Sequence, residues 1–181
     1  MVWIIVIILV LLVLYVISTY NTLIRLKNKV KDGWSQIEVV LKRRADLIPN
    51  LVETVKGYAK HEEGTLTAVI EARNKAVSAT TPEDAMKAEG EVTQALSRLF
   101  ALTESYPELK ANQNFLDLQK SLEETENKIT YSRQFYNDNV LNYNNKTEMF
   151  PSNIIASIFK FEKFKFFEAS EQDRETPRVQ F

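Results

Sequence analysis

The sequence has no cysteine and few of the residues that interrupt helices. Its 181 residues include one histidine, four glycines and five prolines, whereas alanine, leucine, lysine and glutamate are abundant. Without cysteine the chain can form neither disulfide bonds nor zinc–thiolate sites. The formal net charge of -1 argues against a general nucleic-acid-binding protein. This composition favours an all-helical protein with long helices and few turns.

The residue types that carry catalysis or bind metals do not form a recognisable site. His61-Glu62 begins like the zinc-protease pattern His-Glu-x-x-His, but Thr65 stands where the second histidine is required. No Glu-x-x-His pair of a di-iron bundle occurs, and the isolated glycines form no phosphate-binding loop. We therefore expect no enzymatic activity, no cofactor and no metal; a hydrolase built on His61 ranks last among the alternatives.

The first 20 residues predict a membrane anchor. Val2–Ile17 is an unbroken apolar run, and extension to Tyr20 supplies the roughly 20 residues that a helix needs to cross a bilayer. Trp3 near one end and Tyr15 and Tyr20 near the other suit the interfacial aromatic belts. No basic residue precedes the run and no Ala-x-Ala site follows it, so we expect a retained anchor and not a cleaved signal peptide.

The charges beside the anchor predict its orientation. Arg25, Lys27, Lys29 and Lys31 follow the apolar run closely. The positive-inside rule therefore favours an N-terminus outside and the remaining chain in the cytoplasm, while the opposite orientation stays open.

A long helical seam begins directly after the anchor. From Leu23 to Ala76, apolar residues recur every three or four positions, and this spacing keeps its phase across Pro49. We expect one kinked helix over 23–76 in place of two helices joined by a turn. Arg44 and Glu62 occupy seam positions; we expect their stems to cover the seam while the charged heads reach water, the alternative being buried charges with partners.

Three further helices are predicted. Thr81-Pro82-Glu83-Asp84 is a capping sequence that begins a helix ending near Ser105, the next helix runs from about Asn112 to about Lys146, and a short one covers Ile154–Phe159. The predicted fold is all-α: a transmembrane helix continuous with an elongated antiparallel bundle of three long helices plus a short C-terminal helix. The apolar stripes could also serve an intermolecular coiled coil. The corresponding domains are the anchor (1–20), the bundle (21–169) and a polar C-terminal tail (170–181).

Apolar residues and lysines are interleaved between Ile154 and Phe167. This mixture is typical of a segment that binds at a membrane interface, but also of a tail that folds back and caps an open end of the bundle. We favour the second interpretation, because acidic residues such as Glu162 and Glu168 weaken attraction to anionic lipid.

Several blocks of the chain resemble one known family. The blocks are Tyr20–Leu23, Asp32–Val39, Leu41–Val52, Val55–Glu62, Phe135–Asp138, Asn142–Asn144 and Phe150–Ala156. Together they resemble the LemA family over nearly the whole chain, with Gly33 standing where many members have alanine. The resemblance implies bacterial proteins with an N-terminal transmembrane helix and a helical bundle, no established enzymatic activity, and an association with membrane organisation or envelope stress.

Two non-enzymatic functions fit these expectations. The first is a scaffold of the bacterial inner membrane that forms homo-oligomers and organises or remodels the bilayer, because a seam that begins at Leu23 leaves no flexible linker after the anchor. The second is an adaptor that presents a polar surface to another membrane protein, such as a protease or a signalling enzyme. The candidate interaction surface consists of Arg43, Arg44, Asp46, Asn50, Lys56, His61 and Glu62.

Overall fold

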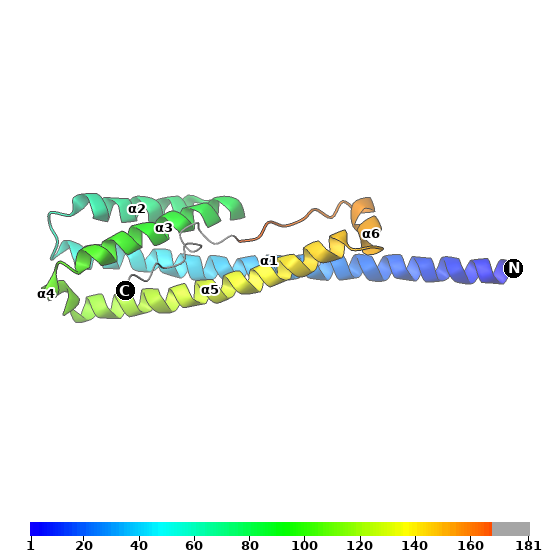
Figure 1. Ribbon diagram of the computed structural model, residues 1–181, viewed down its shortest axis with the longest axis horizontal. Helices are drawn as coiled ribbons and strands as arrows, with labels where there is room; N and C mark the ends of the chain where they lie inside the picture. The colour runs from blue at the N-terminus through cyan, green and yellow to red at the C-terminus, as the bar shows by residue number, and fades with distance from the viewer. Residues whose placement is uncertain (168–181) are drawn as a thin grey trace, which may run out of the picture. The chain divides into compact units, whose positions relative to one another are not determined.

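The computed structural model describes residues 1–167, and within them the fold is all-α, as predicted (Figure 1). The predicted polar tail, residues 170–181, lies outside the described residues. Six helices occur in the described part: α1 (Val2–Lys56), α2 (Glu63–Ser78), α3 (Pro82–Thr103), α4 (Pro107–Lys110), α5 (Gln113–Glu148) and α6 (Ser152–Ile158). The prediction of three long helices and one short one therefore did not separate α2 from α1, and it missed the single turn α4.

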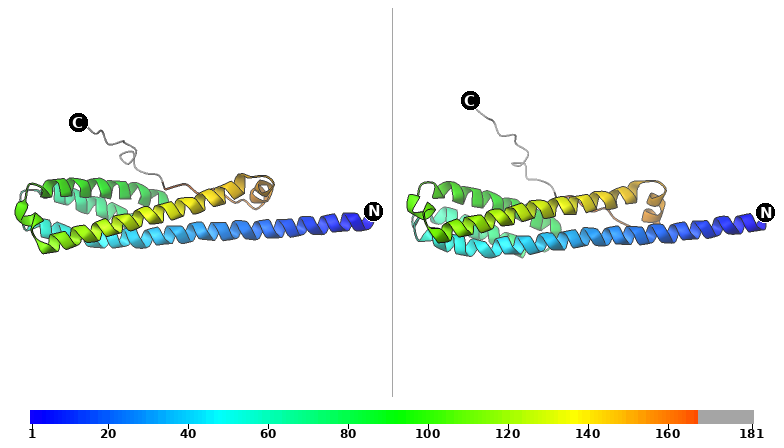
Figure 2. Two further views of the ribbon diagram at one scale, coloured as in Figure 1. Left: turned by 60° about the horizontal axis from the view of Figure 1, so that its bottom comes forward. Right: turned by 90° about the horizontal axis from the view of Figure 1, so that it is seen from below.

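The helices form two compact units. Residues 1–36 and 132–167 make up one, which we call the anchor unit, and residues 37–131 make up the other, which we call the bundle unit. Helices α1 and α5 contribute residues to both units. Within the bundle unit, α2 and α3 lie side by side (Figures 1 and 2).

Helix α1 passes through Pro49 without interruption. Proline has no N–H, so the carbonyl four residues earlier, that of Ala45, loses its helical hydrogen bond. Arg73 of α2 supplies the replacement, because its Nε donates to the Ala45 carbonyl over 3.2 Å. The predicted helix across Pro49 is confirmed, and a side chain from a different helix satisfies the group that proline leaves unpaired.

The prediction of one continuous helix over 23–76 is wrong at residues 57–62, where the chain leaves the helix; residues 63–76 are helical as predicted but belong to α2. Helix α1 ends at Lys56 with a tightened turn, in which the N–H groups of Tyr58 and Ala59 both donate to the Val55 carbonyl. The chain then re-enters a helix at Glu63. Val55, Leu66 and their neighbours belong to one buried cluster. The apolar spacing therefore kept its phase because both helices line the same core, not because they are one helix.

The predicted start of the next helix is confirmed in detail. The Thr81 hydroxyl accepts a hydrogen bond from the Asp84 N–H over 3.1 Å, and Pro82 opens α3. This arrangement satisfies a backbone donor that the first helical turn leaves unpaired. Helix α5 begins with a similar cap, since Asn112 Oδ1 accepts from the Phe115 N–H over 3.0 Å.

The core of the bundle unit is built from apolar faces of α1, α2, α3 and α5. Its fully buried side chains include Ile48, Leu51, Val55, Leu99, Leu109 and Phe115. Branched and aromatic side chains dominate this set, and burying each of them contributes roughly 1.5–3 kcal/mol relative to exposure. The bundle unit is thus held by ordinary hydrophobic packing.

The apolar N-terminal stretch of α1 is exposed along its length. Side chains from Val2 to Leu14 are all at least two-fifths exposed. Helix α1 is the one helix among the described residues that is long and apolar enough to cross a membrane, and only 6% of its most apolar window is buried by the protein. Further along α1, Leu23 is fully buried against Ile155 and Ala156 of α6.

Candidate functional site

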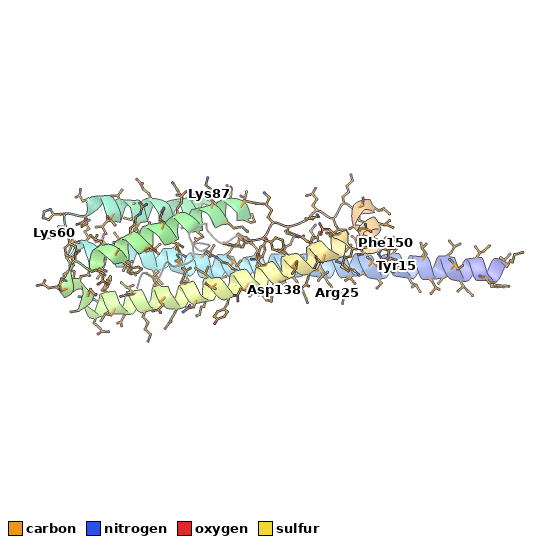
Figure 3. The ribbon with its side chains drawn as sticks, in the orientation of Figure 1. Tyr15, Arg25, Lys60, Lys87, Asp138 and Phe150 are labelled. Carbon is orange, nitrogen blue, oxygen red and sulfur yellow. The ribbon has the colours of Figure 1, made fainter. Side chains whose placement is uncertain are left out.

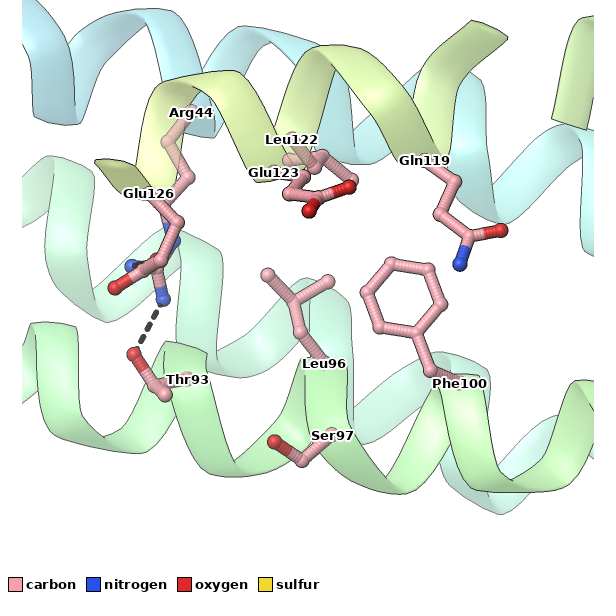
Figure 4. A pocket seen from close by; sticks show the side chains of 9 residues that line it. All are labelled: Arg44, Thr93, Leu96, Ser97, Phe100, Gln119, Leu122, Glu123 and Glu126. Carbon is pink, nitrogen blue, oxygen red and sulfur yellow. Dashed lines mark hydrogen bonds and ion pairs between the residues drawn. The ribbon is translucent and has the colours of Figure 1, made fainter. Parts of the chain in front are cut away.

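The most unusual buried group is the Arg44 guanidinium in the bundle unit. Arg44 is only 1% exposed, so the expectation that its head reaches water is wrong. Its Nη1 donates to Glu126 Oε2 of α5 over 2.7 Å, and its Nη2 donates to Thr93 Oγ1 of α3 over 2.7 Å (Figure 4). Nη1 also lies 3.5 Å from Glu89 Oε2 of α3. One side chain of α1 therefore ties together α1, α3 and α5.

The charges around Arg44 do not cancel. One guanidinium faces two carboxylates; Glu89 is buried, whereas the Glu126 side chain is 44% exposed. Arg44 Nε is buried and donates to no acceptor among the described residues. A buried guanidinium is tolerated only when such partners offset the loss of its hydration. Burial of Arg44 thus depends on carboxylates from two other helices.

A small cavity adjoins the Arg44 cluster. It has a volume of about 280 Å³ and is lined mainly by carbon atoms, with Leu96, Phe100 and Leu122 on its walls and Arg44 and Glu126 at one end (Figure 4). Sites for small molecules usually have volumes of roughly 300–1,000 Å³. The cavity lies just below this range, and we regard it as space left beside the Arg44 cluster.

The candidate interaction residues lie in different environments. Arg43, Asp46 and Asn50 are exposed on α1, whereas Arg44 points into the bundle unit. Lys56 and His61 are exposed near the end of α1 and in the connection to α2. The structure therefore groups the exposed residues along one end of α1 without Arg44. Their role in binding a partner stays a prediction.

Glu62, the second charged seam residue, is half-buried. Its Oε1 accepts a hydrogen bond from the Tyr106 hydroxyl over 3.2 Å. Burial raises the pKa of the Tyr106 phenol, and this hydrogen bond and the nearby carboxylate raise it further. Close by in the sequence, the Tyr58 hydroxyl accepts from Asn112 Nδ2 over 2.9 Å. These contacts tie the connection before α2 to the region around α4, which is a structural role.

In the anchor unit, two Tyr-Asn pairs of α5 hold an extended segment. Asn144 accepts from the Phe164 N–H over 3.1 Å and donates to the Phe164 carbonyl over 2.9 Å. Asn137 does the same with Phe167, at 2.8 and 3.0 Å. The tyrosine before each asparagine adds a hydroxyl donor: Tyr136 donates to the Lys165 carbonyl over 3.0 Å, and Tyr143 donates to the Glu162 carbonyl over 2.9 Å. We call these four residues, Tyr136, Asn137, Tyr143 and Asn144, the clasp.

The clasp shows that the segment between Ile154 and Phe167, which we call the aromatic segment, folds back along the protein, as favoured from the sequence. The segment lies along α5 and also contacts α1. The centres of the Phe167 and Trp34 rings are 6.3 Å apart, and Lys27 Nζ is 5.9 Å from the centre of the Phe161 ring. It therefore runs along helices and does not cap an end. The two Tyr-Asn pairs are seven residues apart, a spacing that places them on one face of a helix. This repeat is the feature of the sequence from which the clasp could have been predicted.

The anchor aromatics fall into two groups. Trp3 and Tyr15 are exposed, whereas Tyr20 is half-buried with its ring centre 4.8 Å from that of Phe159 and 5.6 Å from that of Phe161. The rings are edge-on to one another, the arrangement that aromatic pairs prefer. Tyr20 thus packs within the protein at the end of the apolar stretch.

No candidate metal site is present in residues 1–167, because no three side chains of His, Cys, Asp or Glu come together there. Sequence inspection missed Glu89, Thr93 and Glu126 as partners of Arg44. These residues lie on helices far along the chain, and nothing in their local pattern distinguishes them from other polar residues of a helix surface.

Comparison with known proteins places these features in context. The LemA family model matches residues 33–181. Protein LemA of Metamycoplasma hominis is 27% identical over 158 residues, which cover 85% of this chain and 71% of the relative. Magnetosome protein MamQ 1 of Paramagnetospirillum magneticum is 27% identical over 175 residues. Magnetosome protein MamQ of Magnetospirillum gryphiswaldense is 24% identical over 174 residues.

The match to the magnetosome relatives covers 82% of this chain but 64% of each relative, so the chain spans under two thirds of their length. Together with the exposed apolar stretch of α1, these similarities indicate a membrane-associated protein.

Proposed function

Because the chain belongs to the LemA family, we propose that it is a membrane-anchored helical scaffold of the bacterial inner membrane, which self-associates and organises or remodels the bilayer. The observation that carries the proposal is the continuity of α1. The apolar stretch and the packed part of the anchor unit lie on one uninterrupted helix, Val2–Lys56, with no linker between them.

This continuity has a mechanical consequence. Leu23, six residues beyond the apolar run, is already buried against α6, and Val30 is buried next along the helix. A tilt or a lateral displacement of the anchor unit therefore moves the membrane-spanning stretch with it. A protein built in this way transmits contacts between copies to the bilayer, which is what a membrane scaffold requires.

Two exposed apolar residues of the bundle unit are suited to contacts between copies. Val39 of α1 is 70% exposed and Tyr131 of α5 is 71% exposed. They lie at one level, because α1 and α5 are antiparallel and Arg44 pairs with Glu126, five residues from each. Exposed aromatic and branched side chains at one level supply the apolar centre that an interface needs.

The scaffold proposal is tested by the mass of the full-length protein in detergent micelles. Sedimentation equilibrium is expected to give an oligomer, and a variant with Val39→Lys and Tyr131→Lys is expected to dissociate at lower concentration. Val77→Lys, at an exposed apolar residue of α2, is the matched control. A monomer at high protein concentration would refute self-association. If the double variant assembles like the natural protein, the interface does not include Val39 and Tyr131.

The second candidate function is an adaptor for another membrane protein. The grouping of Arg43, Asp46 and Asn50 on the exposed side of α1, followed by Lys56 and His61, supports it. A photoreactive crosslinker attached to Cys in the Lys56→Cys variant distinguishes the two functions in cells. Adducts between copies support the scaffold, whereas adducts to a different membrane protein support the adaptor.

Neither function involves catalysis. If the protein is not an enzyme, His61→Ala is expected to retain full activity in a cell-based complementation assay. The proposed orientation, with the bundle unit in the cytoplasm, is tested on the same Lys56→Cys variant with a membrane-impermeant maleimide. Labelling only after lysis supports this orientation, and labelling of intact spheroplasts contradicts it.

A further inference from the structure

A short hairpin at the end of α5 lies against the anchor helix. It consists of the turn 149–151 and α6, and the Ser152 hydroxyl holds it together by donating to the carbonyls of Lys146 and Met149 over 2.7 and 2.8 Å. Its inner face, Ile155 and Ala156, is buried against α1. The hairpin is therefore a fixed part of the anchor unit.

The outer face of this hairpin is strongly apolar and exposed. Phe150 is 79% exposed and Ile158 is 65% exposed. The exposed set is Met149, Phe150, Ile154, Ile158 and Phe159. No charged residue occurs from 149 to 159. Five large exposed apolar side chains within eleven residues that carry no charge mark a surface suited to binding something apolar.

The position of the hairpin along α1 identifies what it faces. Its neighbours on α1 are Val16, Tyr20 and Leu23. The apolar run Val2–Ile17 has 16 residues, which at 1.5 Å each cover roughly 24 Å. The hydrocarbon core of a bilayer is about 30 Å thick. The residues just after Ile17 must therefore lie at the edge of the hydrocarbon, and the hairpin packs beside them (Figure 3).

We infer that the outer face of this hairpin, residues 149–159, inserts shallowly into the same bilayer as the anchor, as a second membrane contact. The insertion rests on the membrane anchor of the proposed function but not on self-association. A segment with apolar side chains on one face and polar surroundings lies in the interfacial region and does not span it. The apolar side chains of the hairpin thereby lie in the bilayer at the depth where the apolar run of α1 ends, near Ile17.

The charges around the hairpin fit this placement. Lys160 directly follows the apolar set, and Arg25 and Lys29 are exposed one to two turns further along α1. Basic side chains at that height lie where lipid phosphate groups are found. On the far side of the hairpin, Lys163 is already paired with Glu148. Arg25, Lys29 and Lys160 therefore place exposed positive charge beside the hairpin, at the level of the lipid headgroups.

The bilayer is a better occupant of this surface than a second copy of the chain. The hairpin packs beside Val16, at the end of the exposed apolar stretch of α1 from Val2 to Tyr15, whose side chains lipid must cover. A protein partner would have to be seated half in lipid to cover the outer face of the hairpin. Lipid covers both surfaces at once, without any further component.

Insertion into one leaflet adds volume on one side of the bilayer only. Such shallow insertion is sensitive to membrane curvature. The hairpin therefore gives the proposed scaffold a physical means of responding to, or imposing, curvature, and it also limits rotation of α1 about its own axis.

The absence of cysteine makes the test direct, because a single introduced cysteine carries the only label. The full-length variants Phe150→Cys and Ile158→Cys are labelled with a nitroxide and reconstituted into vesicles of phosphatidylethanolamine and phosphatidylglycerol. Electron paramagnetic resonance then measures the accessibility of each label to oxygen, which is concentrated in lipid, and to a water-soluble nickel chelate. Leu9→Cys provides the lipid reference and Val77→Cys the water reference; both residues are exposed in the protein.

The expected result is a severalfold higher ratio of oxygen to chelate accessibility at 150 and 158 than at 77, together with a higher ratio still at 9. If 9 lies in lipid while 150 and 158 match 77, the insertion is wrong and the anchor stands. If 9 also matches 77, the anchor is absent, and both the insertion and the proposed function fail. Labels at 150 and 158 that are shielded from both reagents would show that protein covers the hairpin, which also overturns the inference.

Discussion

Replacing Arg44 by methionine tests whether the buried ion cluster stabilises the bundle unit. Methionine keeps most of the side-chain volume but removes the donors to Glu126 and Thr93. The Glu89 carboxylate then stays buried without the guanidinium that now lies 3.5 Å from it. Removing one member of a buried ion pair costs about 3–5 kcal/mol, chiefly because the remaining buried charge loses its opposite charge. The Glu126 carboxylate is partly exposed and can turn to water, so we expect a loss at the lower end of this range, about 3 kcal/mol.

The assay is urea unfolding of the full-length protein in detergent micelles, followed by circular dichroism. With a slope of about 2 kcal/mol per molar urea, a loss of about 3 kcal/mol lowers the midpoint by about 1.5 M. Arg43→Met is the matched control, because Arg43 is adjacent and exposed. Substitutions at such surface positions usually change stability by no more than about 0.5 kcal/mol.

A second variant separates the effect of removing the opposite charge from the effect of lost packing. In Arg44→Met with Glu89→Leu, both buried charges are replaced by apolar groups, and the exposed Glu126 can turn to water. We expect this double variant to recover part of the stability that Arg44→Met loses, because a buried ion pair can often be exchanged for apolar side chains at little cost. The reasoning is refuted if Arg44→Met is as stable as Arg43→Met, or if the double variant is less stable than the single one.

Three further predictions follow from contacts that cross between segments. Arg73→Ala is expected to lower the free energy of unfolding by about 1–3 kcal/mol in the natural chain, because the Ala45 carbonyl loses its donor. The loss should be smaller in a chain that also carries Pro49→Ala, because alanine restores the missing N–H. Equal losses in the two backgrounds of this double-mutant cycle would contradict the assignment. Asn144→Ala removes both hydrogen bonds to the extended segment, so hydrogen exchange there should accelerate about tenfold or more, whereas Asn142→Ala, at an exposed position, should leave it unchanged. Burial and then a nearby carboxylate raise the pKa of Tyr143, so its contribution to stability is complete below the unfolded pKa of about 10 and is lost as the pH rises through the folded value. Tyr143→Phe should flatten the alkaline fall of the unfolding midpoint, and an unchanged slope would argue against this assignment.

Pro49 and the end of α1 show where sequence periodicity succeeds and where it fails. The apolar spacing predicted correctly that the helix passes through Pro49, but the contact that makes this possible comes from Arg73, 28 residues from Ala45. The same spacing wrongly joined α1 to α2. Residues on both sides of the turn line one core, so their spacing reports which side chains are buried. It does not report whether the backbone reverses between them.

Arg44 shows the corresponding limit for the site. Its place in an apolar seam marked it as exceptional, and that much was predictable from the sequence. Its environment was not, because Thr93 and Glu126 lie 49 and 82 residues away. Whether a charged seam residue is buried or reaches water depends on what neighbouring helices place opposite it. Glu62 also occupies a seam position, but it is half-buried, with a hydrogen bond from the Tyr106 hydroxyl.

The aromatic segment of the anchor unit combines two roles that its composition could not separate. Ile154, Ile158 and Phe159 are exposed beside the end of the apolar stretch, whereas Phe164 and Phe167 have both backbone polar groups bonded to the clasp. The first half faces outward and the second is bound to α5. If the first half is inserted in lipid, as inferred above, a change in the bilayer that exerts a force on the hairpin also strains the hydrogen bonds of the clasp. That force is transmitted through the clasp to α5. Membrane state and helix packing are then coupled within one unit, at a level set by the length of the anchor.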